Sequence, residues 1–239
     1  MTGAMETLRA QAANNNNIAN ANTTGFRGEL IGAQAVPVTG TGFDSRVNVR
    51  MFDNGWDSTQ GETQNTGNPL DVVMGENNWL AVQASDGSEA YTKAGNLHVD
   101  ASGALLTSSG QPVLSDNGPI TIPANSKIDI GGDGTITIQA AGSAPNALAQ
   151  VGRLKVVTGT PQQLQRRPDG LMAPIGGNPL DAATGQVLHS GALESSNVNL
   201  ASSMVTMLQL ARQFELQTKL MQSADQNASA SSSLINLNN

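Results

Sequence analysis

The sequence predicts a mixed fold, in which a central all-β domain is flanked by N- and C-terminal α-helices that pair as a coiled-coil-like unit. Residues 198–221 and residues 1–19 carry apolar side chains at helical spacing, and the middle of the chain is a series of short apolar runs broken by glycine turns. These patterns divide the chain into an N-terminal helix (1–25), an extended arm (26–66), an all-β domain (67–190) and a C-terminal helix (191–239).

Composition and charge exclude several classes of protein. The chain has no cysteine, which excludes disulfides and thiolate metal sites. Its net charge is −7 without a basic cluster, which argues against nucleic acid as a partner. No apolar run is long enough for membrane insertion, and no cleaved signal peptide is visible. The charges in residues 1–26 and in residues 196–239 cancel, so each end can approach other copies with little repulsion.

The C-terminal run holds the strongest helix signal. At 100° per residue, most of its apolar side chains fall within an arc of roughly 160°. They are Leu200, Met204, Met207, Leu208, Leu210, Ala211, Phe214 and Met221. A second, narrower stripe consists of Val198, Val205, Leu216 and Leu220. A helix packed once on its own domain needs one apolar face, so two stripes predict neighbours on two sides. The alternative is an ordinary core helix. The polar tail after Met221 is compatible with a longer helix or with fraying.

The N-terminal segment predicts a helix with a narrow seam. Its seam positions alternate in steps of four and three. They are Met1, Met5, Leu8, Ala12, Asn15 and Ala19. The Asn14–Asn17 run disfavours helix but can fix the register between helices; a frayed N-terminus is the alternative. Gly25 suits a position of positive φ after a helix.

The middle of the chain predicts short strands. In the arm, Val36-Pro37-Val38 resists helix and Arg46–Phe52 alternates like a half-buried strand. In the β domain the strand candidates are 70–74, 79–83, 90–92, 96–99, 104–107, 112–114, 120–122, 127–130, 135–139 and 152–157. The sequence Gly-Asn-Pro-Leu-Asp occurs at Gly67–Asp71 and again at Gly177–Asp181. We interpret this repeat as a shared turn solution or chance, not as a duplication.

No catalytic, cofactor-binding or metal-binding residues are identified, and we expect no enzyme. His98 and His189 have no third ligand type at metal spacing, and Asp129–Thr135 lacks the later glutamate of a calcium loop. No P-loop, nucleophile elbow or dinucleotide fingerprint is present. Four carboxylates could pair as in a glycan hydrolase, but nothing singles out a pair; they are Glu62, Asp71, Asp100 and Asp116.

Four ordered motifs resemble those of the bacterial flagellar rod and hook protein family. They lie at residues 16–27 (Asn-Asn-Ile-Ala-Asn-Ala-Asn-Thr-Thr-Gly-Phe-Arg), 67–75 followed by Trp79, 91–107, and 191–199 followed by Arg212–Glu215. The signature residues are Asn17, Ala19, Asn20, Thr24, Gly25, Phe26, Gly67, Asn68, Leu70, Asp71, Gly95, Gly191, Leu193, Glu194, Ser196, Asn197 and Val198. Chain length and the segment Ala35–Val38 resemble the proximal-rod branch more than the distal-rod or hook branches. Members of this family carry one or two further helical turns before the position of Met1.

The resemblance implies a structural subunit of the flagellar basal-body rod, without cofactors. Its partners would be copies of itself, other proximal and distal rod subunits and the type III export apparatus, with no nucleic acid and no direct membrane insertion. It would reach the periplasmic rod without a cleaved signal, assemble through its terminal helices and transmit torque from motor to hook. The expected assembly residues are Met5, Leu8, Ala12, Ile18, Leu200, Met204, Met207, Leu208, Phe214, Leu220 and Met221. The alternatives are a distal-rod or hook subunit of the same family, and a cell-wall glycan hydrolase with a β domain.

Overall fold

The computed structural model describes residues 2–37, 47–140 and 148–237, and it divides the chain into two units. The terminal unit consists of Met1–Ala21, Gly28–Trp56 and Val198–Asn239, and the central unit of Asn22–Arg27 and Asp57–Asn197. The described chain is mostly β, with one helix toward each end, as the sequence predicts. Predictions that involve Met1, Val38 or Arg46 lie outside the described residues.

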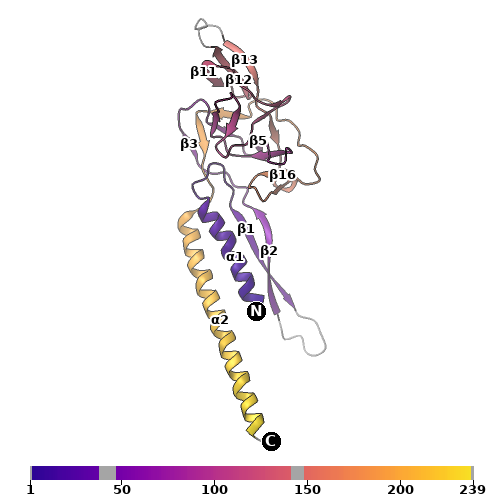
Figure 1. Ribbon diagram of the computed structural model, residues 1–239, viewed down its shortest axis with the longest axis vertical. Coiled ribbons are helices and arrows are strands. Elements are labelled where there is room, and N and C mark those ends of the chain that lie inside the picture. The colour runs from indigo at the N-terminus through magenta and orange to yellow at the C-terminus, as the bar shows by residue number, and fades with distance from the viewer. Residues whose placement is uncertain (1, 38–46, 141–147, 238–239) are drawn as a thin grey trace. The chain divides into compact units, whose positions relative to one another are not determined.

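The terminal unit contains two helices and a hairpin. Its elements are α1 (Thr2–Ala19), β1 (Glu29–Pro37), β2 (Val47–Trp56) and α2 (Leu200–Leu237). β1 and β2 pair antiparallel, with Ala33 opposite Met51 and Ala35 opposite Val49. Figure 1 shows α1 between α2 on one side and the hairpin on the other. The hairpin therefore gives α1 a second neighbour besides α2.

The two helices differ in length. Asn199 caps α2, because its Oδ1 accepts a hydrogen bond of 2.9 Å from the Ser202 N–H. The helix then continues through the polar tail to Leu237, which selects continuation over fraying. At a rise of 1.5 Å per residue, α2 is about 57 Å long and α1 about 27 Å. As a result α2 runs on past the end of α1, as Figure 1 shows.

The central unit is an assembly of small antiparallel sheets. The largest has five strands in the order β14-β5-β6-β16-β15. Its strands are β5 (Asn78–Gln83), β6 (Glu89–Thr92), β14 (Val156–Thr158), β15 (Leu164–Arg166) and β16 (Met172–Pro174). A three-stranded sheet contains β11 (Asn125–Ile130), β12 (Thr135–Ala140) and β13 (Leu148–Arg153). A short 3₁₀ helix, η1 (Pro161–Gln163), precedes β15.

Four pairs of short strands complete the central unit, and two of them join distant parts of the chain. The pairs are β7 (Leu97–Val99) with β8 (Leu105–Thr107), β9 (Leu114–Ser115) with β10 (Gly118–Pro119), β4 (Val72–Met74) with β17 (Leu188–Ser190), and β3 (Thr63–Asn65) with β18 (Ala192–Glu194). Aliphatic side chains from these strands and the larger sheets form one core, with Leu80, Leu105 and Val113 fully buried.

The structure corrects several strand predictions. Ile120–Ile122 is not a strand; only Thr121 forms an isolated bridge, to Ala104, and Pro119 and Pro123 flank the segment. The strand predicted at 152–157 is two strands, β13 and β14, separated by Leu154 and Lys155. β3, β15, β16, β17 and β18 were not predicted, because each has three residues of which at most two are apolar, whereas the three-residue strands β4 and β8 lie in the longer apolar runs 70–74 and 104–107.

Candidate functional site

One face of α2 meets α1. Six half-buried residues of α2 follow steps of four and three: Ser203, Met207, Leu210, Phe214, Gln217 and Met221. Two of these positions bond to α1: Asn14 Nδ2 donates to the Ser203 carbonyl over 2.9 Å, and Thr7 Oγ1 donates to Gln217 Oε1 over 3.2 Å. Met207, Phe214 and Met221 of the expected assembly residues therefore line the seam within the subunit.

The face of α1 that bonds to α2 is small and polar, in contrast to the seam that the sequence predicts. Thr7 and Asn14 are buried there, and Gly3 lies beside the Gln217 side chain. The predicted seam residues lie elsewhere on α1: Met5 is 62% exposed, Leu8 is 48% exposed and Ala12 is also exposed. Ile18 is half-buried. The apolar stripe of α1 is thus left open in the isolated chain.

α2 has exposed apolar side chains outside its seam. Leu200, Met204 and Leu208 flank the seam on one side, and Leu208 is 57% exposed. Val205, Leu216 and Leu220 lie on the opposite side of the helix, roughly 180° from Met207 at 100° per residue. Leu220 is 70% exposed. Both predicted stripes therefore carry large apolar side chains that the single chain does not cover.

The asparagine run attaches α1 to its neighbours. Besides the bond from Asn14 to α2, Asn17 exchanges two hydrogen bonds with the backbone of Glu29, at 2.7 and 3.0 Å. Asn16 Nδ2 donates to Glu29 Oε1 over 2.7 Å. Glu6 Oε2 accepts the Met51 N–H of β2 over 3.0 Å. These polar contacts join α1 to both α2 and the hairpin, although the asparagine of the predicted seam, Asn15, is exposed and Asn14 makes the bond to α2.

Within the central unit, four signature segments far apart in the sequence come together. We call residues 23–27, 67–71, 93–95 and 191–197 the signature cluster. The Gly25 N–H donates to the Glu194 carbonyl over 2.8 Å, and the Gly191 N–H donates to the Asp71 carbonyl over 2.7 Å. A Cβ on Gly25 would lie 2.3 Å from the Lys93 backbone. The motifs of the sequence are therefore neighbours in the fold.

A buried ion pair joins the first and last of these segments. The Arg27 guanidinium contacts the Glu194 carboxylate, and each side chain is only 1% exposed. Burial of the guanidinium charge is tolerated only with the carboxylate present, because an unpaired charge is costly to remove from water. The ion pair extends to a further segment, because Glu194 Oε1 also accepts the Gly61 N–H over 3.0 Å. Arg166 lies over the Phe26 ring, 4.8 Å from its centroid.

Lys93 is a second buried cation near this pair. Its Nζ donates to the carbonyls of Gly75 and Glu76 over 2.6 and 2.9 Å and lies 5.0 Å from the centroid of the Trp79 ring. Burial lowers the pKa of Lys93 to about 8, while the Glu194 charge acts in the opposite direction. Burial also raises the pKa of Tyr91 to about 12. The Tyr91 hydroxyl accepts the Leu180 N–H over 3.0 Å.

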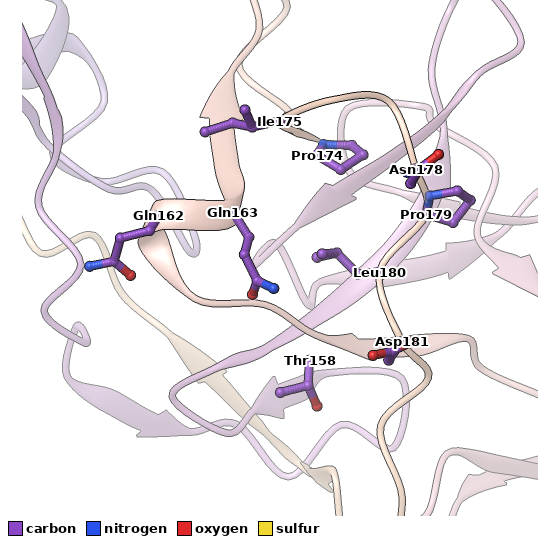
Figure 2. Close-up of a pocket in the computed structure, with 9 residues that line it drawn as sticks. All are labelled: Thr158, Gln162, Gln163, Pro174, Ile175, Asn178, Pro179, Leu180 and Asp181. Atoms are coloured by element: carbon purple, nitrogen blue, oxygen red, sulfur yellow. The ribbon is translucent and has the colours of Figure 1, made fainter.

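The two Gly-Asn-Pro-Leu-Asp segments adopt different environments. In the first, Asn68 Nδ2 donates to Asp71 Oδ1 over 3.1 Å and the Asp71 N–H donates to the Asn68 carbonyl over 3.0 Å. The second lines a pocket of about 310 Å³ with Pro174, Ile175 and the η1 region, as Figure 2 shows. Its polar lining is engaged or exposed, since Gln163 Oε1 accepts the Thr160 N–H. This pocket has no buried polar group directed into it.

The carboxylates and histidines singled out in the sequence serve turns or face solvent. Asp100 Oδ1 accepts the Ser102 hydroxyl, and this bond, followed by those from the Ala104 and Ser102 N–H groups, holds the pKa of Asp100 below its ordinary value. Asp133 binds Thr135 in the same way, in the turn between β11 and β12. His98 and His189 are exposed. Among the described residues, no three His, Asp or Glu side chains form a metal site, and none of the described helices is apolar enough over 18 residues to cross a membrane.

Sequence reasoning missed the partners of Arg27 and Lys93. A charged residue in a motif is usually expected to face solvent or a ligand. Neither Arg27 nor Lys93 has its buried partner close to it in the sequence, so local patterns did not suggest burial. A glycine in each motif was the one sequence feature that could have indicated close packing at these positions. Gly25 has φ +67°, and a Cβ on Gly95 would lie 1.7 Å from the Val72 carbonyl oxygen, so both positions require close backbone approach.

The remaining signature residues lie within the two units. Gly67 has φ +70° and donates its N–H to the Gly191 carbonyl, and Leu193 pairs with Gln64 in the short sheet. Asn197 Nδ2 donates to the carbonyls of Asp57 and Thr59. Asn20 Nδ2 bonds back to Asn16, and Ala19 is exposed at the end of α1. Thr24, Leu70, Ser196 and Val198 are half-buried.

Comparison with known proteins agrees with this arrangement. Residues 189–234 match the family model described as flagellar basal body rod FlgEFG protein C-terminal, and residues 73–138 match the flagellar hook protein FlgE/F/G D1 domain. The chain is 41% identical to the flagellar basal-body rod protein FlgF of Escherichia coli (strain K12), with 99% of this chain and 96% of the relative covered.

Other relatives extend the comparison. FlgF of Salmonella typhimurium is also 41% identical, over 99% of this chain and 96% of the relative. The rod protein FlgG of Bacillus subtilis (strain 168) is 30% identical over 88% of each chain. Similarity of this extent over nearly the whole chain, together with the convergence of the signature segments, leads to one conclusion. The chain belongs to the flagellar basal-body rod protein family.

Proposed function

We propose that the chain is a structural subunit of the proximal rod, which assembles with copies of itself and with other rod proteins through α1 and α2. In this proposal the two helices form a coiled-coil-like pair inside the rod, and the rigid assembly transmits torque from motor to hook. The subunit leaves the cytoplasm through the flagellar type III export apparatus without a cleaved signal and acts in the periplasmic part of the rod. It has no catalytic role.

The observation that carries the proposal is the exposed apolar surface of the two helices. α2 presents Leu208 on one side and Leu216 and Leu220 on another, and α1 presents Met5 and Leu8. Complete burial of one such side chain contributes about 1.5–3 kcal/mol of stabilising free energy, and an isolated subunit lacks this stabilisation. Neighbouring subunits that cover these stripes would add it once per contact, which favours a repeating assembly.

The distribution of charge supports the same conclusion. The charged residues of α2 are Arg212, Glu215, Lys219 and Asp225, and they sum to zero. Lys219 Nζ lies 3.0 Å from Glu215 Oε1 on the helix surface. Glu6 and Arg9 of α1 also cancel, so the whole net charge of −7 lies outside the helices. Copies can approach through the helices with little repulsion, whereas their central units repel each other.

A single position on α2 tests the proposal. Leu208→Asp introduces a charge into an exposed stripe and should abolish incorporation into rods and motility, while unfolding of the central unit stays unchanged. Leu208→Met keeps an apolar side chain at the same position and should preserve both. The proposed assembly face is wrong if Leu208→Asp is incorporated as efficiently as Leu208→Met.

The position within the flagellum needs a separate test. Immunolabelling of isolated basal bodies should place the protein in the proximal rod; label in the distal rod or the hook would select another branch of the same family. A zymogram on cell-wall glycan should show no clearing. Clearing that depends on a carboxylate of the central unit would instead support the glycan hydrolase.

A further inference from the structure

The chain passes between the two units at four places. The crossings follow Ala21, Arg27, Trp56 and Asn197. Inside the central unit these segments are bonded to one another. The Asn197 N–H donates to the Phe26 carbonyl over 3.2 Å, and its side chain donates to the carbonyls of Asp57 and Thr59 over 3.0 and 2.9 Å.

Glu194 is the centre of this arrangement. Its side chain contacts Arg27 from the first segment and accepts the Gly61 N–H from the second, while its carbonyl accepts the Gly25 N–H. The next residue continues the contact, because the Ser195 N–H donates to the Glu62 carbonyl over 2.8 Å. One residue thus connects three segments that are far apart in the sequence, and it does so with its side chain and its backbone.

We propose that residues 22–27, 57–62 and 194–197 form a clasp, closed by the Arg27–Glu194 ion pair, that stays formed in the free subunit whether or not the terminal helices are folded. The clasp holds the chain that leads from α1 and the chain that leads into α2 at one place. Both helices are then delivered to the growing rod as a tethered pair. This inference rests on the proposed assembly through α1 and α2.

The physical reason is effective concentration. Segments joined by short linkers meet at effective concentrations in the millimolar range, whereas a chain of more than 170 residues between two free helices would dilute them. The ion pair suits such a role because it resists partial opening. Removing either partner leaves a charge buried without compensation, so the clasp is either closed or fully disrupted.

Hydrogen exchange on the full-length wild-type subunit tests the clasp directly. The amides of Gly25, Ser195 and Asn197 should exchange within about tenfold of Ala81, whose N–H donates to the Lys155 carbonyl in the central sheet. Amides of residues 211–233 in α2 report on the helices independently. If the clasp amides exchange far faster than the Ala81 amide, the clasp proposal is wrong. The exchange rate of the α2 amides tests only the assembly proposal.

Variants separate the clasp from general stability. Glu194→Gln should reduce protection of the three clasp amides on the order of a hundredfold, relative to Ala81. Glu215→Gln makes the same change at the exposed pair with Lys219 and should leave them unchanged. If Glu194→Gln does not fold, Asn197→Ala provides the milder test, with a loss of about tenfold. Unchanged protection in Glu194→Gln, or in Asn197→Ala where that variant is used, overturns the proposal.

Discussion

At the scale of single residues, glycines explain why the signature segments can meet. Gly25 has a positive φ of +67°, and its Cα lies against the backbone of Lys93, where a Cβ would come within 2.3 Å of the carbonyl carbon and oxygen. Backbone atoms at that point cannot move aside as a flexible side chain can. The residue is therefore required twice, once for its conformation and once for its size.

Gly25→Ala should destabilise the central unit more than a conformational effect alone. Gly170 provides the matched control, because it has a similar φ of +82° and no atom within 4 Å of a Cβ. Gly170→Ala should cost about 1–2 kcal/mol for the left-handed conformation, and Gly25→Ala should cost more because of the added clash. Urea unfolding of the two variants measures the difference, and equal losses would contradict the close approach seen at Lys93.

Buried Lys93 and Tyr91 predict an unusual alkaline stability profile. The pKa of Lys93 is lowered from 10.5 to about 8, so between these values the unfolded chain binds more protons and the free energy of unfolding rises with pH. The pKa of Tyr91 is raised from 10.0 to about 12, so above pH 10 the folded chain keeps a proton that the unfolded chain loses, and stability falls.

Urea unfolding between about pH 7 and pH 12 should therefore show maximal stability of the central unit near pH 10. Lys93→Met should remove the rise and Tyr91→Phe should remove the fall, whatever each does to stability at neutral pH. A wild-type free energy of unfolding that stays constant between pH 8 and pH 10 would show that Lys93 does not titrate as its burial requires.

At the scale of elements, the contact between α1 and α2 is specified by polar groups. Asn14 is buried and donates to the Ser203 carbonyl over 2.9 Å, while Asn15, one position along, is exposed. Both residues lower the helix propensity of α1 by a similar amount. Their difference in environment isolates the value of the interhelical hydrogen bond.

Asn14→Ala should weaken incorporation into the rod and Asn15→Ala should not. Loss of a hydrogen bond worth about 1 kcal/mol corresponds to roughly a fivefold disadvantage against wild type. Expression of each variant together with wild type, followed by mass spectrometry of purified basal bodies, gives the ratio. If the two variants are incorporated equally well, Asn14 has no role in setting the register.

Among the strands, local sequence patterns predicted some elements and missed others. Strands of the middle region such as β5 and β12 were predicted well, because alternation and glycine turns are local signals. The pairing of β18 with β3 could not be predicted, since three-residue strands carry no pattern and the partners are distant in the sequence. The exposure of Met5 and Leu8 could not be predicted from the spacing of apolar residues. The side of α1 that faces α2 carries Thr7 and Asn14, which make hydrogen bonds that an apolar pattern does not reveal.

At the scale of the whole molecule, the two units have different physical characters. The central unit has a continuous aliphatic core and an ion pair and hydrogen bonds around Glu194. The terminal unit has helices with many exposed apolar side chains outside the α1–α2 seam, and α2 extends beyond α1 with exposed polar and alanine residues from Gln222 to Ser233. A helix that is polar all round and lacks neighbours is unstable in water. The motifs predicted the family from the sequence alone, whereas only the structure shows that the segments carrying them lie in contact.

The most direct test of this account is limited trypsin proteolysis of the full-length subunit at low concentration, compared with assembled rods. Arg212 and Lys219 lie on the exposed surface of α2, whereas Arg27 and Lys93 are buried in the central unit. In the free subunit we expect rapid cleavage after Arg212 and Lys219 and a resistant central fragment, and in rods we expect the α2 sites to be protected. A dilute subunit in which Arg212 and Lys219 survive as long as Lys93 would contradict the claim that the helices are completed by neighbouring subunits.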